Sequence, residues 1–142
     1  MILGFELAKI NVERKNRPTG DVKVKHNLNV DSVKELAIER MGKRKSLDVS
    51  FTFTVDYEPG LGNIMISGSL IYTAEDAALN KVISHWKSKK KVPKEASLEI
   101  VNAILTKCNI KSLELAEDVN LPYHMPLPKI EAAKQDYGNY IG

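Results

Sequence analysis

Regular alternation of side-chain character over two long stretches constrains the fold of this chain most. One side of the alternation carries Val22, Val24, His26, Leu28 and Val30 in the first stretch, and Leu47, Val49, Phe51, Phe53, Val55 and Tyr57 in the second. Polar residues occupy the positions between them. Successive side chains of a strand point to opposite faces, so this pattern predicts strands with one buried and one solvated face. Strands of this kind belong to an antiparallel sheet.

Two more strands are expected on either side of these stretches. Residues 63–73 keep one phase, and the Pro59-Gly60 turn chemistry of residues 58–63 predicts a hairpin with the preceding strand. Residues 2–14 change phase partway, which predicts a bulge or sharp bend. The apolar positions there are Leu3, Phe5, Leu7, Ile10 and Val12.

The stretch between the two alternating strands fits two structures. Asp31 and Ser32 suit the start of a short helix over residues 31–41, because both side chains can cap one. The same residues equally suit a loop. Residues 40–45 are strongly basic and indicate a loop.

Beyond residue 73 the spacing of apolar residues changes to three and four, which predicts helices. The first helix is expected from about Ala74, capped by Thr73, with an apolar stripe of Leu79, Val82, Ile83 and Trp86. The second is expected to open at Pro93 and run to about Asp118, with a possible interruption at Asn109. Its apolar stripe is Leu98, Val101, Ile104, Leu105 and Cys108.

Strands followed by helices predict an α+β fold, a four-stranded antiparallel sheet with helices packed on one face. The 142 residues are expected to form a single domain, with the sheet in 1–73. Helices and a proline-rich segment follow in 74–130, and 131–142 form a tail or short helix.

The proline-rich segment covers residues 120–128. Three prolines exclude a helix interior, because each lacks an N–H and fixes φ. The segment still carries Leu121, Tyr123, Met125 and Leu127, so we expect it to lie docked against the body of the protein. Three roles fit it: a structural strap, one wall of an apolar groove for extended peptide, or an oligomer contact.

The string from Ile104 to Ile130 resembles the C-terminal part of the SecB chaperone family, in which a long helix precedes an apolar, proline-containing loop and a short last helix. The order of strands and helices upstream is also similar. The resemblance implies an ATP-independent chaperone of the cytoplasm, active in protein transport, that holds non-native or extended polypeptide and assembles as a homo-oligomer, a dimer or tetramer. The expected polypeptide contacts are Tyr123, Met125 and Leu127, followed by Phe5, Leu7 and Trp86.

Catalysis has little support in the sequence, and we expect no enzyme, cofactor or metal site. The only cysteine, Cys108, is interpreted as a small core residue, and a chain without a possible internal disulfide suits the reducing cytoplasm. His26 is interpreted as a core or interface residue, His85 as a surface residue, and His124 lies in the proline-rich segment. The sequence contains neither a signal-peptide pattern at its start nor a run of about 20 apolar residues.

A basic cluster supports an alternative function, the binding of nucleic-acid phosphates. Its members are Lys87, Lys89, Lys90, Lys91 and Lys94, which Arg40, Lys43, Arg44 and Lys45 could extend. Solvated lysines at the end of a helix explain the same pattern without a ligand.

Overall fold

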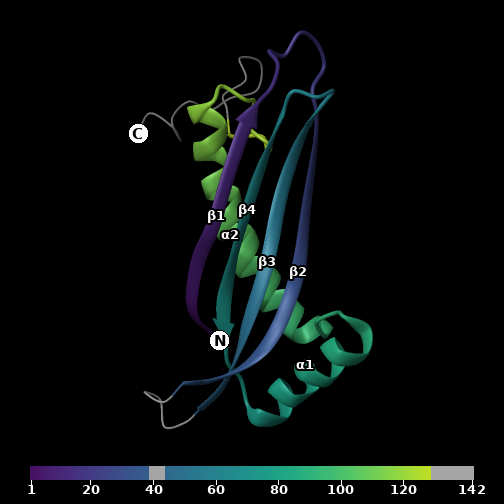
Figure 1. Ribbon diagram of the computed structural model, residues 1–142, viewed down its shortest axis with the longest axis vertical. Coiled ribbons are helices and arrows are strands. Elements are labelled where there is room, and N and C mark those ends of the chain that lie inside the picture. Colours follow the sequence, from purple (N-terminus) through teal and green to yellow (C-terminus); the bar gives the residue numbers. More distant parts are fainter. Residues whose placement is uncertain (39–43, 129–142) are drawn as a thin grey trace, which may run out of the picture.

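A computed structural model describes residues 1–38 and 44–128. The elements are β1 (Ile2–Arg14), β2 (Lys23–Ile38), β3 (Arg44–Glu58), β4 (Gly62–Tyr72), α1 (Asp76–Lys89) and α2 (Lys94–Asp118) (Figure 1). The expected tail or short helix at 131–142 lies outside the described residues, as do Arg40 and Lys43.

The four strands form one antiparallel sheet in the order β1-β4-β3-β2. The hairpin is therefore the centre of the sheet, because β3 and β4 pair with each other and each takes one outer strand. Strands β1 and β2 are the two edges. Figure 1 shows α2 lying diagonally across one face, with α1 at one end of the molecule. The α+β fold with helices on one face is thus confirmed.

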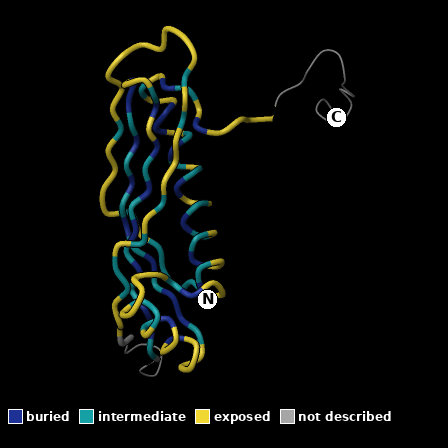
Figure 2. Tube along the Cα trace, turned by 90° about the vertical axis from the view of Figure 1, so that its right-hand side faces the viewer, coloured by how far each residue is buried: buried dark blue, intermediate teal, exposed yellow. Residues whose placement is uncertain are grey.

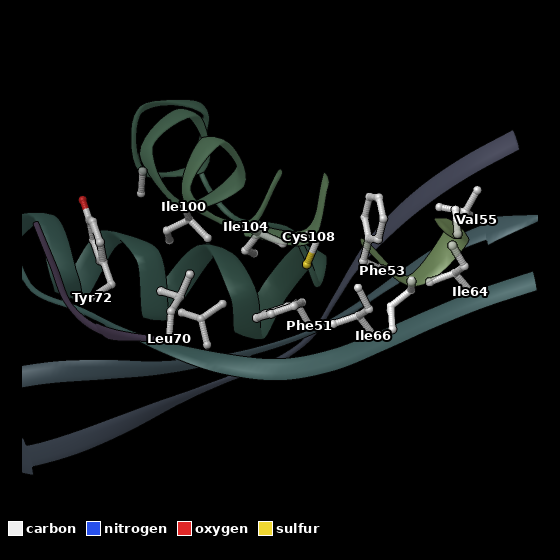
Figure 3. Packing of buried hydrophobic residues seen from close by; sticks show 14 of the residues in the cluster. Phe51, Phe53, Val55, Ile64, Ile66, Leu70, Tyr72, Ile100, Ile104 and Cys108 are labelled. Atoms are coloured by element: carbon white, nitrogen blue, oxygen red, sulfur yellow. The ribbon is translucent and has the colours of Figure 1, made fainter. Parts of the chain in front are cut away.

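The core lies between the helices and the inner face of β3 and β4. Burial alternates residue by residue along β4, and the inner-face side chains of β3 are fully buried (Figure 2). Phe51 and Phe53 pack there together with Ile104 and Cys108 of α2 (Figure 3). Polar side chains occupy the outer face of β3, so the predicted two-faced sheet is present.

The buried stripe of helix α2 shares Ile104 and Cys108 with the predicted one but does not include Leu98, Val101 or Leu105. The buried positions are Ala96, Ile100, Ile104, Cys108, Ser112, Leu115 and Ala116, whereas Leu98 is 69% exposed. The helix carries apolar residues around most of its circumference, so spacing alone did not identify the buried side. Small residues at 96, 112 and 116 let the helix approach the sheet closely. The helix is continuous through Asn109.

The predicted phase change in β1 is confirmed as a shift in register against β4 between Leu7 and Lys9. After the shift, Ile10 and Val12 pair with the inner-face residues Ile66 and Ile64. A second shift lies between Ile2 and Gly4.

Residues 31–38 form neither a helix nor a loop, because β2 continues through them to Ile38. The register shifts between Val30 and Ser32, which leaves Asp31 as the extra residue of a bulge. The Asp31 carboxylate accepts hydrogen bonds from Asn29 Nδ2 (2.7 Å) and from Thr52 Oγ1 on β3. The side chain that suggested a helix cap instead holds the bulge against the neighbouring strand.

The predicted cap of the first helix is also wrong. Glu75 is the N-cap of α1, and its side chain makes no capping hydrogen bond. Thr73 is buried, and its Oγ1 donates to the Lys45 carbonyl oxygen (3.3 Å). The hydroxyl therefore joins the end of the sheet to β3 before the helix begins.

Candidate functional site

The proline-rich segment begins as a helix cap. Asn120 has a left-handed φ of 58°, and the Leu121 N–H donates to the Ala116 carbonyl (2.8 Å). This pattern closes the last turn of a helix and satisfies carbonyls that the helix leaves free. The Leu121 side chain is buried in the core. Leu121, the second residue of the segment, is therefore fixed by its backbone to α2 and by its side chain in the core.

His124 seats the segment on the sheet. It is 5% exposed, and its Nε2 lies 2.9 Å from Asn109 Oδ1 on α2. Its ring meets His26 of β2 edge-on with centroids 5.3 Å apart, and Phe53 of β3 at 6.5 Å. The segment thus crosses from the end of α2 to the inner face of β2 and β3.

The protonation state of His124 follows from these contacts. Because Asn109 Oδ1 can only accept, Nε2 carries a hydrogen and donates it. Nδ1 is buried and has no hydrogen-bond partner among the described residues. Burial of the ring, and next the nearby His26, lower the pKa of His124 from its ordinary value.

The apolar side chains of the segment remain at the surface. Tyr123, Met125 and Leu127 are 42%, 37% and 46% exposed, and residues 125–128 extend away from the body in Figure 2. The expectation of a docked segment is right as far as His124 and wrong beyond it. Only Leu121 and His124 insert their side chains into the core, so the following described residues lack a buried anchor.

Among the described residues, strand β2 pairs with β3 alone, so its other edge is open near this segment. Its inner-face apolar residues are only half-buried: Val22, Val24, Leu28, Val30 and Val33. The main contacts of α2 are with β4 and β1, while α1 contacts β2 and β3. His124 lies over the other end of β2, at His26. The middle of the β2 inner face, at Leu28 and Val30, is therefore only partly covered by the described residues.

The other predicted polypeptide contacts lie elsewhere. Phe5 and Leu7 are half-buried on β1. The Phe5 ring packs against Phe51 (centroids 5.4 Å apart), and Lys107 Nζ lies 5.7 Å from its centroid. Trp86 is half-buried on α1, at the opposite end of the sheet from the proline-rich segment (Figure 1). Tyr123, Met125 and Leu127 therefore share one exposed stretch of the chain, whereas Phe5 and Leu7 lie on β1 and Trp86 lies on α1.

The basic cluster gathers around the turn between α1 and α2. Lys87, Lys89, Lys90, Lys91 and Lys94 are all exposed there. Lys45 does not extend this free charge, because its Nζ contacts Glu35 Oε1 (3.2 Å) and Asn80 Oδ1 (2.7 Å).

The reactive side chains offer little chemistry. The described residues contain no group of three His, Cys, Asp or Glu that could hold a metal. Cys108 is fully buried, and burial raises the pKa of its thiol to about 11, which confirms a core role.

The histidines differ from one another in their surroundings. His26 is exposed in this chain and its ring contacts His124, so the core alternative of its interpretation is wrong, while the interface alternative stays a prediction. His85 is half-buried on α1, and its Nδ1 donates to the Lys91 carbonyl oxygen (2.8 Å).

Within the ranges 1–38 and 44–128, neither helix has the length and apolarity needed to cross a membrane.

Three features went unnoticed in the sequence: the seat of His124, its partner Asn109, and the open apolar edge of β2. A histidine among prolines signals nothing by itself, and its partner lies 15 residues away on a helix. The alternation in β2 predicted which residues face inward, but not which of them a helix would leave uncovered.

Comparison with known proteins gave one structural similarity. No family model matches the chain, and no curated protein matches its sequence. A SecB-like chaperone of Mycobacterium tuberculosis, solved in complex with a peptide from an antitoxin, is similar with a TM-score of 0.49 and 10% identity. The match covers 94% of this chain and 92% of that one. This similarity concerns only the arrangement of the chain.

Proposed function

We propose that this protein binds extended or non-native polypeptide at the β2 edge, without catalysis and without a nucleotide cofactor. The observation that carries the proposal is the open β2 edge, flanked by half-buried apolar side chains, with His124 of the proline-rich segment over His26 near one end. An extended chain could add to the sheet there as a fifth strand.

The geometry of β2 suits strand addition. An edge strand has unpaired N–H and C=O groups, and an added strand satisfies them while its alternate side chains contact one face of the sheet. Residues Lys23 to Val30 pair with β3 in unbroken register, so their outer side offers a regular series of such groups. Leu28 and Val30 would meet every second side chain of the added strand.

Tyr123, Met125 and Leu127 are proposed as further apolar contacts. Their exposure leaves them free to meet a client, and methionine adapts to clients of different shape. Phe5, Leu7 and Trp86 would not touch the same short peptide. A client reaching Trp86 would have to run along most of β2, about 50 Å in extended form for 16 residues.

A peptide-binding assay tests the β2 edge. A fluorescent, unstructured peptide of alternating apolar residues is titrated with the protein, and polarisation gives the Kd. We expect Leu28→Lys to weaken binding at least about tenfold, since it places a charge on the inner face beside the edge. Asn27→Lys is the matched control, because it adds the same charge to the outer face of the same strand.

Equal Kd values for the two variants, with both proteins folded by circular dichroism, would exclude the β2 edge as the site. A second assay measures aggregation of a denatured client protein at near-stoichiometric ratio. Replacing Tyr123, Met125 and Leu127 together by serine should reduce the suppression of aggregation.

We also propose that the chain assembles as a homo-oligomer, a dimer or tetramer. Leu98 and Ile110 are large apolar side chains exposed on α2, and a second copy could cover them. Light scattering coupled to size exclusion decides this point, and a monomer at micromolar concentration would oppose it. The cytoplasmic location and the role in protein transport stay predictions.

Nucleic-acid binding is the second candidate, because five exposed lysines gather at one turn. It predicts binding to single-stranded or duplex DNA that weakens steeply as salt rises. Replacing Lys87, Lys89 and Lys91 by glutamate should abolish it. The same replacements at the distant residues Lys9, Lys15 and Lys23 change the net charge equally and should retain most of the binding. Equal loss in both triple variants would indicate nonspecific attraction.

A further inference from the structure

One side chain holds the proline-rich segment to the sheet beyond its helix cap. Leu121 is fixed by α2, and among residues 122–128 only His124 is buried. Pro122 is half-buried and the other five residues are exposed. The position of Tyr123 and Met125, the two neighbours of His124 in the chain, therefore depends on whether the His124 ring keeps its contacts with His26, Phe53 and Asn109.

The surroundings of His124 favour the neutral imidazole ring over the protonated one. In the neutral ring the hydrogen lies on Nε2 and bonds to Asn109 Oδ1, which leaves Nδ1 as a bare lone pair. A second proton would create a buried N–H without an acceptor among the described residues, and would place a positive charge against Phe53. Buried unpaired donors and buried charges are both unfavourable.

Among the described residues, three elements pack against the His124 ring, and only β2 presents an ionisable side chain, His26. β2 presents His26, β3 presents Phe53 and α2 presents Asn109. A protonated His26, 5.3 Å away between ring centroids, repels a protonated His124. Residues 122–128 bring no acidic side chain of their own that could offset this repulsion.

Docking and acid therefore oppose each other. Burial and His26 lower the pKa of docked His124 below its ordinary value of 6.5, to which the released ring returns. The released segment thus binds a proton more readily than the docked one. Docking is at full strength above pH 6.5 and weakens as the pH falls below it.

We propose that His124 is a proton-controlled latch, which holds the proline-rich segment against β2 when neutral and releases it on protonation. The latch rests on the His26, Phe53 and Asn109 contacts. Its effect on binding rests additionally on the proposed function: release would move the residues around His124 away from the His26 end of β2 and lower the affinity for polypeptide in acid.

Nuclear magnetic resonance of the peptide-free protein tests the latch directly. The heteronuclear NOE of the Tyr123 and Met125 amides reports order on the picosecond to nanosecond timescale. We expect values of an ordered backbone at pH 7.5 and a clear loss at pH 5.5. His124→Phe keeps a ring against Phe53 but cannot titrate, so its values should be the same at both pH values. His85→Gln, on α1, should retain the wild-type response.

A second variant keeps the test decisive if His124→Phe disturbs folding. His26→Thr removes the neighbouring charge from an exposed strand position, so the loss of order at pH 5.5 should become smaller. An ordered segment at pH 5.5 in the wild-type protein would overturn the latch. A response unchanged by His26→Thr would show that His26 takes no part in it, contrary to the proposal.

The binding arm separates the latch from the proposed function. The peptide Kd at the β2 edge should rise several-fold between pH 7.5 and 5.5 in the wild-type protein and stay constant in His124→Phe. If the segment opens in acid while peptide fails to bind at either pH, the latch stands and the proposed function is wrong. If peptide binds equally at both pH values and the segment remains ordered, the proposed function stands and the latch is wrong.

Discussion

The two edge strands of the sheet have similar alternating sequences and very different surroundings. Strand β1 is held under α2, with Phe5 packed on Phe51 and beneath Lys107. Its register against β4 shifts twice, which interrupts the series of unpaired groups on its outer side. Strand β2 has a single bulge, at Asp31, and its Leu28 and Val30 are only half-buried.

The difference indicates that the two edges of the sheet have different roles. The β1 edge contributes apolar contacts to folding and is poorly shaped for pairing with another chain. The β2 edge contributes less to the core and keeps a regular, apolar margin available. The following measurements compare the two edges, from the largest expected effect to the smallest.

Thiol labelling should separate the covered and uncovered parts of the inner face most strongly. Cys108 of α2 is fully buried and its raised thiol pKa suppresses the reactive thiolate, so it should react mainly after unfolding. A Leu28→Cys variant in a Cys108→Ala background should react at least about a thousandfold faster, because opening of a stable domain is rare. Labelling with a chromogenic disulfide at pH 8 measures both rates. Similar rates would show that the middle of β2 is covered too.

Gly68→Ala should destabilise the protein through the β1 side, by about 3 kcal/mol. An added Cβ would collide with the Glu6 carbonyl oxygen and approach Leu7 Cα, both in the backbone of β1. Neither atom can move without disturbing the pairing of β1 with β4. Urea denaturation measures the change in the free energy of unfolding.

Gly4→Ala is the matched control for this clash. A Cβ there would meet only the Ile71 side chain, 3.5 Å away at ordinary contact distance. We expect a change within about 1 kcal/mol, because alanine also removes the entropic cost of glycine in a strand. Similar losses at both positions would mean that β1 is not closely pressed on β4.

Truncation of the inner-face side chains compares the two edges directly. Phe5→Ala should cost about 2 kcal/mol and Leu28→Ala about 1 kcal/mol, both less than for fully buried residues. The larger loss at Phe5 follows from its aromatic partner Phe51 and from the Lys107 ammonium over its ring. Chemical denaturation measures both, and a larger loss at Leu28 would reverse the proposed roles of the edges.

Local sequence pattern predicted the sheet well, because period-two alternation reports directly on the two faces of a strand. It also located the β1 bulge, since Leu7 and Ile10 lie in opposite phases. The same reasoning failed at Asp31, whose carboxylate serves a helix cap or a bulge equally well. Only its contact with Thr52 on the neighbouring strand decides between them.

The candidate site was less accessible to sequence reasoning because it depends on contacts between distant segments. Tyr123, Met125 and Leu127 were noted as apolar residues of a non-helical segment, but they were expected to be docked, and all three are exposed. The contacts of His124 could not be predicted without knowing how α2, β2 and β3 are arranged around it. The choice of buried stripe on α2 failed for a related reason: Leu98 and Ile100 are equally apolar, and only packing on the sheet distinguishes them.

The smallest expected effect on stability concerns the charges that protect the β2 edge. Lys25 is exposed, and its Nζ lies 3.4 Å from Glu58 Oε1, a surface ion pair that stabilises the fold by less than about 0.5 kcal/mol. Its stronger contribution should be to solubility, because a lysine on an edge strand discourages pairing with a second copy. Lys25→Thr should therefore barely change the free energy of unfolding while increasing self-association.

Lys9→Thr on β1 completes the comparison. Lys9 is exposed on the other edge and directly follows a register shift, where the strand is already unsuited to regular pairing. Removal of its charge should leave both stability and association unchanged. Sedimentation velocity over a range of concentrations measures association of the two variants. An equal increase in the association of both variants would mean that charge alone keeps both edges from pairing with other chains. A selective increase in Lys25→Thr would show that strand regularity makes β2 the edge that can accept another chain.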